Sequence, residues 1–334
     1  MINIPPFEIT NTALNLVVQI SEKIGRLQAD YDKQLHLRKN NRLRSIQASL
    51  AIENNSMSLE QVADIINGKR VLGEPKDIQE VKNAYEAYEK ILRFSPYSVK
   101  DFLTAHRLMT QGLIKDAGKF RLGDVGIFNH KGDVIHMGAR PEFVPKLVKD
   151  LFAWAKNDDT PALIKSCVIH YELELIHPFA DGNGRMGRLW QNVLLSQSNP
   201  VFAWLPIETM VYEYQDEYYA TLRQADKTSS ATVFIEFMLS IILKTIQSYP
   251  EKQMSDIVSD IVSDKFSLPE KEAYSKITHY LESNLTISNQ QAQQLLKKSA
   301  PTVRRYLHKF MTEGLLQAIG NNKARVYLKT NNNE

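Results

Sequence analysis

The sequence predicts a mainly α-helical protein: a large helical domain with a short β-hairpin, followed by a small α+β domain at the C-terminus. Two observations support this fold class. Apolar residues recur every three or four positions through most of the first 250 residues, as on the buried face of a helix, and alternating strand-like stretches are few and short. Near the C-terminus, helical patterns give way to two short apolar segments around a turn.

Size and composition narrow the class of protein. The 334 residues are 43% hydrophobic and 24% charged, enough for one large domain with an appendage or for two ordinary domains. The net charge of +3 is too small for a nucleic-acid or membrane coat over the whole surface, although it allows a local patch. A single cysteine, Cys167, excludes an internal disulfide framework and is expected to be a buried thiol.

The N-terminus lacks the pattern of a secretion signal, and the longest apolar stretch, residues 233–246, is interrupted by Glu236 and Lys244. We therefore expect a cytoplasmic protein.

Capping-box patterns at Ser58–Gln61 and Asp77–Glu80 indicate helix starts. Helices are expected at about residues 10–34, 38–53, 58–67, 77–94, 98–113, 141–156, 160–176, 182–197, 207–225 and 229–249. Residues 125–128 and 134–136 flank the turn-forming segment 129–133, which predicts a β-hairpin; an ordinary loop between helices is the alternative. His130 and His136 lie beside this turn without the further ligands of a zinc site.

A second domain is expected near Pro269. Residues 269–334 contain ten Lys or Arg and five Asp or Glu. Helical patterns at about 270–283, 288–296 and 300–313 precede the segments 315–319 and 325–328, which flank the turn 320–323, as in a winged helix. We thus divide the chain into an N-terminal helical region (1–95), a catalytic core (96–250), a linker or connecting helix (251–268) and a winged-helix domain (269–334).

The segment from His177 to Arg188 concentrates one imidazole, one carboxylate, three glycines and two arginines. Asp181–Gly184 is expected to be a tight loop before a helix, whose first N–H groups and dipole favour a phosphate. Arg185 and Arg188, three positions apart, are expected to face the same anion. Asp181 could hold Mg²⁺, and His177 could accept a proton from a hydroxyl. These are the parts of a phosphoryl- or nucleotidyl-transfer site.

This segment, His177-Pro-Phe-Ala-Asp-Gly-Asn-Gly-Arg-Met-Gly-Arg188, resembles the signature of the Fic family. The resemblance implies transfer of AMP from ATP to a protein hydroxyl. By position, it makes His177 the general base, Phe179 a core anchor and Asp181 the Mg²⁺ ligand. It assigns the phosphates to Gly182, Asn183, Gly184, Arg185 and Arg188. Lysine at the position of Gly184 characterises the related Doc kinases, so glycine there favours AMP transfer.

Two further segments extend the resemblance. Ala117–Arg121 and the hairpin resemble the family's flap, which aligns the target segment; its expected residues are Val125, Ile127, Val134 and Ile135. Residues 206–210 and 217–222 resemble the segment that closes the adenine pocket, where Tyr218 or Tyr219 could contact the base or simply belong to the core.

The segment Ser49-Leu-Ala-Ile-Glu-Asn54 matches the family's inhibitory motif. The resemblance implies that Glu53 pairs with Arg188 and withholds it from the γ-phosphate of ATP, so that ATP binds unproductively. A carboxylate can compete with a phosphate for one guanidinium, which makes such a brake physically reasonable. The alternative is that Glu53 is a solvated charge at a helix end.

The sequence thus predicts an autoinhibited, Mg²⁺-dependent protein adenylyltransferase that acts on a Ser, Thr or Tyr hydroxyl of another protein or of itself. A DNA-binding regulator with an ATP-sensing domain is one alternative, because Thr302, Arg304, Arg305, His308 and Lys309 in residues 288–328 could face DNA; that domain could equally bind protein. A hydrolase that removes AMP is the other alternative. His170 is expected to be a satisfied core side chain, and a homodimer is possible.

Overall fold

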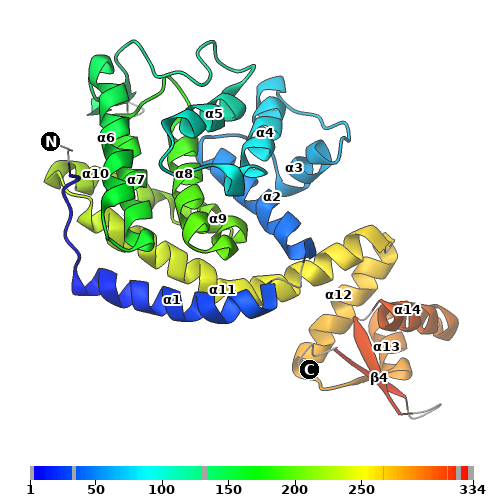
Figure 1. Cartoon of the computed structure of the whole chain (residues 1–334). Helices are drawn as coiled ribbons and strands as arrows, with labels where there is room; N and C mark the ends of the chain where they lie inside the picture. Colours follow the sequence, from blue (N-terminus) through cyan, green and yellow to red (C-terminus); the bar gives the residue numbers. More distant parts are fainter. Residues whose placement is uncertain are drawn as a thin grey trace. The chain divides into compact units, whose positions relative to one another are not determined.

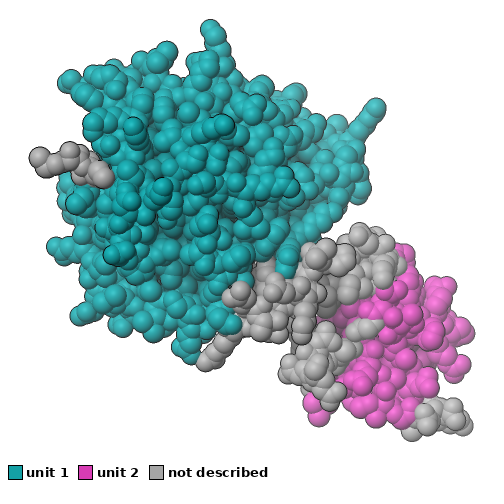
Figure 2. All heavy atoms as spheres, in the orientation of Figure 1, with its two compact units in different colours: residues 1–249 teal, residues 250–334 magenta. Residues whose placement is uncertain are grey.

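The computed structural model describes residues 4–31, 35–128, 134–265, 267–313, 315–320 and 325–329. The chain divides into two compact units, Met1–Tyr249 and Pro250–Glu334, which Figure 2 colours separately. The architecture is mainly helical, as predicted. None of the helices in these described ranges is long and apolar enough to cross a membrane.

The first unit is a helical body with one two-stranded sheet. Its elements are α1 (Asn11–Tyr31), α2 (Leu35–Ile52), α3 (Leu59–Ile66), α4 (Pro75–Tyr88), α5 (Val99–Thr110), β1 (Gly126–Phe128), β2 (Val134–Met137), α6 (Val144–Asn157), α7 (Ala162–Ile176), α8 (Asn183–Ser198), α9 (Ile207–Glu213), α10 (Gln215–Thr228), α11 (Thr232–Lys265) and three 3₁₀ turns, Ile91–Arg93, Pro141–Phe143 and Pro200–Trp204. The helix α11 continues past the division between the units.

The core of this unit surrounds α7 and α8, which lie side by side (Figure 1). Trp190 of α8 is fully buried, and its ring centroid lies 5.0 Å from that of Phe102 on α5 and 5.8 Å from that of Phe152 on α6. Its Nε1–H donates to the Pro96 carbonyl oxygen at 3.0 Å. This aromatic cluster ties α8 to two neighbouring helices, so the N-terminus of α8 starts from a fixed position.

Several helix boundaries differ from the sequence prediction; α11, for example, runs to Lys265 rather than ending near residue 249. The capping box at Ser58–Gln61 is present, but α4 begins at Pro75, before Asp77, because proline at the first helical position needs no hydrogen-bond acceptor for its nitrogen. The Asp77 carboxylate instead accepts from the Ser56 hydroxyl at 2.6 Å. The helix expected over 207–225 is two helices that meet at Tyr214.

The second unit orders its elements as α12 (Leu268–Ser283), β3 (Ile287–Ser288), α13 (Asn289–Leu296), α14 (Ala300–Thr312), β4 (Leu316–Ile319) and β5 (Val326–Lys329). β5 pairs antiparallel with both β3 and β4. This is the predicted order of three helices followed by two strands, with the short β3 added; the predicted turn falls largely outside the described residues.

Candidate active site

The His177–Arg188 segment links the end of α7 to the start of α8. Two residues in the left-handed region make the bend, His177 with a φ of 52° and Gly182 with a φ of 84°. Glycine adopts this conformation without steric cost, whereas histidine must be held in it. The Asn183 side chain closes the bend, because its Oδ1 accepts from the Phe179 N–H and its Nδ2 donates to the Phe179 carbonyl, both at 2.8 Å.

Arg121 holds the end of α7. Its guanidinium donates to the His177 carbonyl at 2.6 Å, to the Ile176 carbonyl at 3.3 Å and also to the carbonyl of Ala139, just after β2. The side chain is buried. Arg121 therefore fixes the backbone of the catalytic-type histidine and the base of the hairpin together.

His106 of α5 holds the bend from the other side. Its ring stacks on Phe179 with centroids 3.6 Å apart and planes 5° from parallel, and both residues are fully buried. The Gly118 N–H donates to Nδ1 at 2.9 Å, so Nε2 must carry the proton that it shares with the Asp181 carbonyl at 3.0 Å. Burial lowers the pKa of His106 to about 4, which keeps this neutral form at physiological pH.

The helix α8 begins at Asn183, close to the expected helix range 182–197, so the bend ends before the predicted loop Asp181–Gly184 does. Of the three glycines of this segment, Gly182 alone adopts a positive φ. Gly184 and Gly187 lie within the helix, where the absence of a side chain leaves room for neighbouring side chains. A Cβ at Gly184 would overlap the Glu53 carboxylate, and one at Gly187 would overlap that of Glu174. The first N–H groups of α8 have no acceptor within the helix, which leaves an anion site at its start.

The two arginines do not meet the same partner. Arg185 is buried, with Nη1 3.2 Å from Oε1 of Glu80 on α4 and Nη2 3.4 Å from Oδ2 of Asp181. The Asp181 side chain is 52% exposed, and its Oδ1 accepts from the Gly182 N–H at 2.7 Å. The expectation that both guanidinium groups bind one anion stays a prediction; in the structure Arg185 pairs with Glu80 and Asp181, while Arg188 pairs with a different carboxylate.

Arg188 instead meets the segment that resembles the inhibitory motif. Its Nη2 lies 2.7 Å from Oε1 of Glu53 and donates to the Ser49 carbonyl at 3.0 Å, while Nε donates to the Ser49 hydroxyl at 3.1 Å. Burial alone would lower the pKa of Arg188, but Glu53 outweighs it and raises the pKa. Glu53 is therefore not simply a solvated charge at a helix end.

The spacing of this motif has a structural reason. Ser49 and Glu53 are four residues apart, one helical turn, so both reach Arg188 from the end of α2. Asn54 has a φ of 66° and ends the helix, and the Asn55 N–H returns to the Leu50 carbonyl at 3.1 Å. Asparagine and glycine are the residues that adopt this left-handed capping conformation most readily.

A cavity of about 380 Å³ lies beside these groups. Glu53, His177, Gly184 and Arg188 line one part of it; the remaining lining residues are Gly126, Tyr171, Glu174, Leu175, Tyr218, Tyr219, Leu222, Arg223 and Asp226. Nδ1 of His177 lies 3.3 Å from the Glu174 carbonyl oxygen, which can only accept. That contact assigns the proton to Nδ1 and leaves Nε2 as the basic nitrogen.

The cavity includes both tyrosines expected near an adenine base. Tyr218 is buried, and its hydroxyl lies 3.0 Å from Nε2 of His170, whereas Tyr219 is 37% exposed. The sequence reasoning missed Glu174, Arg223 and Asp226, which belong to the same wall. Burial raises the pKa of Glu174 to about 7. Their placement along the cavity depends on how α7 and α10 pack, which no motif encodes.

The predicted hairpin is present as an antiparallel pair, with Gly126 opposite Met137 and Ile127 opposite His136. Of the expected flap residues, Val125 directly precedes β1, Ile127 lies in β1, and Val134 and Ile135 lie in β2. The turn, including His130, lies outside the described residues. Gly126 lines the cavity, so the base of this flap borders the same space as His177.

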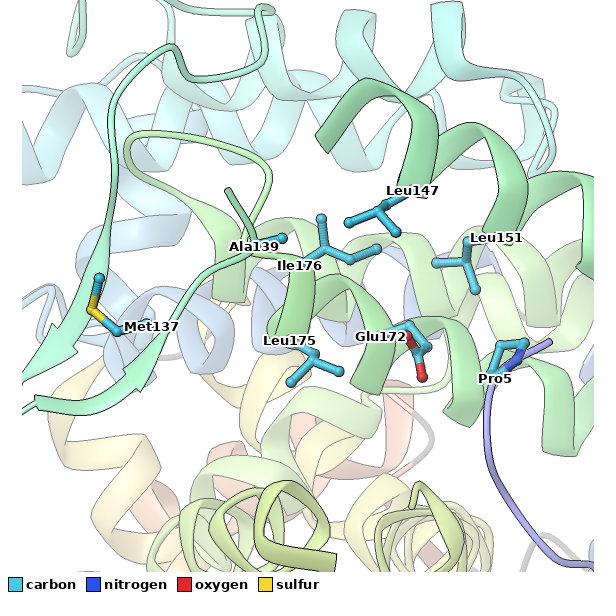
Figure 3. A pocket seen from close by; sticks show the side chains of 8 residues that line it. All are labelled: Pro5, Met137, Ala139, Leu147, Leu151, Glu172, Leu175 and Ile176. Carbon is cyan, nitrogen blue, oxygen red and sulfur yellow. The ribbon is translucent and has the colours of Figure 1, made fainter. Parts of the chain in front are cut away.

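A second cavity of about 240 Å³ lies next to the first and shares Leu175 with it. Figure 3 shows Glu172 of α7 in this cavity among Pro5, Leu151 and Ile176. Burial in this apolar surrounding raises the pKa of Glu172 to about 7.

The remaining singled-out side chains are structural. His170 is fully buried with Nδ1 2.6 Å from Oε1 of Gln191, as expected of a satisfied core histidine. Cys167 is a buried thiol, and burial raises its pKa to about 12. The described part of the chain has no group of three His, Cys, Asp or Glu residues that could hold a metal ion by itself.

Comparison with known proteins agrees with this geometry. The model of the Fic/DOC family matches residues 96–195. A Fic family protein from Desulfovibrio desulfuricans G20 has a solved structure that is 38% identical, with a TM-score of 0.71 over 99% of this chain and all of the other. This chain belongs to the Fic family.

Curated relatives of this Fic protein align with part of this chain and with part of their own length. Protein adenylyltransferase fic-1 of Caenorhabditis elegans is 29% identical over 69% of this chain and 46% of its own length. A probable protein adenylyltransferase of Aquifex aeolicus (strain VF5) is 26% identical over 62% of this chain and 64% of its own. The aligned region thus spans less than two thirds of the length of each of these relatives.

Proposed function

We propose that this Fic protein is an autoinhibited protein adenylyltransferase that transfers AMP from ATP to a Ser, Thr or Tyr hydroxyl of a target protein or of itself. One observation carries the proposal: the start of α8, Arg188 and His177 border a single cavity large enough for a nucleotide. The adenylyltransferase names of the curated relatives support the same reaction.

The chemistry follows from the positions of these groups. The triphosphate of ATP would lie over the first N–H groups of α8, with Arg188 neutralising the γ-phosphate. The target hydroxyl would enter along the base of the hairpin. As its oxygen forms a bond to the α-phosphorus, Nε2 of His177 accepts its proton, the bond between the α-phosphorus and the bridging oxygen breaks, and pyrophosphate leaves.

Asp181 would hold Mg²⁺. A magnesium ion in a nucleotide site commonly takes one or two carboxylates, several waters and the substrate phosphates, and the half-exposed Asp181 carboxylate at the start of α8 fits that donor set. When bound, the ion would neutralise phosphate charge. Because Asp181 Oδ2 is also 3.4 Å from Arg185, the same bend would orient the cation and one guanidinium.

Glu53 would be the brake. Its Oε1 occupies the guanidinium of Arg188 at 2.7 Å and adjoins the space above Gly184, where phosphate oxygens would otherwise lie. With that arginine engaged, ATP would bind with its α-phosphate out of line for attack. The ion pair is mostly enclosed on the Arg188 side, so it is screened less by salt than a surface pair.

The test uses ATP labelled with ³²P at either the α- or the γ-phosphate, incubated with cell lysate and the Glu53→Gly protein. Label that depends on His177 is the part above that seen with Glu53→Gly/His177→Ala, since kinases of the lysate transfer the γ-phosphate in both reactions. We expect such label from α-labelled ATP only, and more strongly than with the unmodified chain. Label from γ-labelled ATP that depends on His177 would instead identify a kinase. No such label from either position, with the protein folded and binding ATP, would contradict the proposal.

Removal of AMP is a second candidate because Glu53 borders the cavity and could position water. Incubating a labelled target with the unmodified chain and with Glu53→Gly separates the two activities. Loss of label that requires Glu53 would establish removal, while a stable label in both reactions would leave transfer as the activity.

A further inference from the structure

Basic residues of the second unit are concentrated in one segment. Between Ser288 and Thr312 the sequence contains five Lys or Arg, one His and no Asp or Glu. Acidic residues flank this segment, with Glu270, Glu272 and Glu282 on α12 and Glu313 directly after α14, and α12 also carries Lys271 and Lys276. A concentration of positive charge in one segment of so small a unit is typical of proteins that bind a polyanion.

Packing determines which side of α14 faces outward. Val303, Tyr306, Leu307 and Phe310 are buried at helical spacing in the core of this unit, together with Tyr274 and Ile277 of α12. Arg304, Arg305 and His308 are therefore turned to solvent, and all three are exposed. The orientation of these cationic side chains follows from the hydrophobic core of the unit.

The turn between α13 and α14, directly before α14, adds two exposed cations. Lys297 ends α13 with a φ of 53°, and both it and Lys298 are exposed. We call Lys297, Lys298, Arg304, Arg305 and His308 the basic face. Lys309 is not part of it, because its Nζ lies 2.9 Å from Oε2 of Glu270. Among the described residues of α13 and α14, it is Lys309 that forms an ion pair with a carboxylate.

We propose that this Fic protein binds duplex DNA through the basic face, with α14 in the major groove. The partner is chosen by shape as well as charge: α13, a short turn and α14 form two successive helices, the arrangement in which the second helix enters the groove. An α-helix is about 10–12 Å wide, which matches the ~12 Å width of that groove.

The residues of the basic face would contact different parts of the DNA. Lys297 and Lys298 precede α14, where they would meet the phosphate backbone and set the position of the helix. Arg304 and His308 are one helical turn apart on α14, and Arg305 lies with its guanidinium 5.5 Å from the Tyr306 ring. Arginine in this location can donate two hydrogen bonds to guanine or neutralise a phosphate. A protein partner with an acidic surface is the competing occupant.

The experiment measures binding of the full chain to a fluorescently labelled random 30-base-pair duplex by anisotropy, at several KCl concentrations. Four or five phosphate contacts predict a slope of log affinity against log salt of about −4. We expect Arg304→Ala/Arg305→Ala to weaken binding by about 10- to 100-fold and to reduce that slope by about 2. The matched control is Lys276→Ala, an exposed lysine on α12, which should leave binding unchanged.

A single-stranded 30-mer provides the shape control, since it has the phosphates without the groove. We expect the duplex to bind at least about tenfold more tightly. Absence of duplex binding at low salt, equal affinity for the single strand, or a double variant that binds like the unmodified chain would each overturn the proposal. Capture of an acidic protein that depends on Arg304 and Arg305, without duplex binding, would assign the basic face to that protein instead.

Thermal unfolding of the full chain, compared with the unmodified protein, serves as the folding control for the Arg304→Ala/Arg305→Ala variant. The proposed adenylyltransferase activity could fail while DNA binding is observed, and the reverse is equally possible. The two proposals are thus tested separately.

Discussion

The His177–Arg188 bend and the end of α2 border the same cavity and meet where Glu53 contacts Arg188, yet they are held very differently. His106, Arg121 and Asn183 hold the bend through hydrogen bonds to its backbone, and all three are buried. Glu53, by contrast, is 35% exposed and meets Arg188 through one carboxylate oxygen. The backbone of the bend is thus held by buried hydrogen bonds, whereas Glu53, which we propose as the brake, is held by one partly exposed contact.

The largest expected effect comes from the chemical group that the bend positions. In the Glu53→Gly background, His177→Ala should lower AMP transfer by about 10²–10⁴-fold, the usual contribution of a general base. ATP affinity should stay within about twofold, because the phosphate-binding groups remain. Single-turnover transfer and calorimetric ATP binding provide the two measurements. Turnover that survives the substitution would show that the bend does not present a base.

The next effect tests whether the bend needs its hydrogen-bonded support. His106→Phe preserves the stacking on Phe179 but loses the contacts to Gly118 and Asp181. We expect a loss of about 2–4 kcal/mol in the free energy of unfolding, since two buried backbone groups lose their partner. In the Glu53→Gly background, AMP transfer should fall more than ATP binding does.

The matched control for His106→Phe is Lys165→Met, which likewise removes two hydrogen bonds to backbone groups, the carbonyls of Ala155 and Asp158, but near the opposite end of α7 from the bend. It should reduce stability with little change in transfer per folded molecule. If both variants change transfer equally, His106 acts only through global stability.

A smaller effect concerns the apolar cavity beside the site. Burial raises the folded-state pKa of Glu172 from 4.5 to about 7, so the folded chain holds a proton there that the unfolded chain has released. Its contribution to stability is present below about pH 4.5 and is lost as pH rises through 7. Glu172→Gln should therefore raise stability at pH 8 by on the order of 1–3 kcal/mol and have little effect at pH 4.5.

Denaturant unfolding at both pH values measures this difference, and the exposed Glu60→Gln provides the control. A Glu172→Gln effect that is the same at pH 4.5 and pH 8 would contradict burial of an ionisable carboxyl in this cavity.

The smallest expected effect concerns the contacts that Ser49 and Glu53 make with Arg188. Ser49→Ala removes the hydroxyl that accepts from Nε of Arg188 but keeps the Ser49 carbonyl and Glu53 as partners. One hydrogen bond among three should contribute about 0.5–1.5 kcal/mol. Basal AMP transfer should rise by no more than about tenfold, well short of the rise in Glu53→Gly. An equal rise would mean that the hydroxyl, and not the carboxylate, restrains Arg188.

The sequence anticipated the parts of the site that lie within short segments. The bend, the hairpin strands and the meeting of Glu53 with Arg188 each depend on spacing or on a family resemblance over a few residues. The supports of the bend were not anticipated, because His106 and Arg121 act on backbone groups 75 and 56 positions away. The partner of Arg185 was missed for the same reason, since Glu80 lies on α4.

The helix boundaries show the same limit. Three glycines indicated a loop through Gly184, yet only Gly182 needs a positive φ, and the other two make room for the carboxylates of Glu53 and Glu174. Which reason applies to each glycine depends on neighbours that only the folded chain supplies.

The most direct test of the account is calorimetric binding of ATP and of AMP to the unmodified chain and to Glu53→Gly, in the presence of Mg²⁺. AMP lacks the γ-phosphate, the group that Arg188 would bind once it is released from Glu53. We expect Glu53→Gly to increase ATP affinity by about tenfold or more, a coupling of ~1.4 kcal/mol, and to leave AMP affinity unchanged. An equal change in affinity for both nucleotides, or no change for ATP, would contradict competition between Glu53 and the γ-phosphate for Arg188.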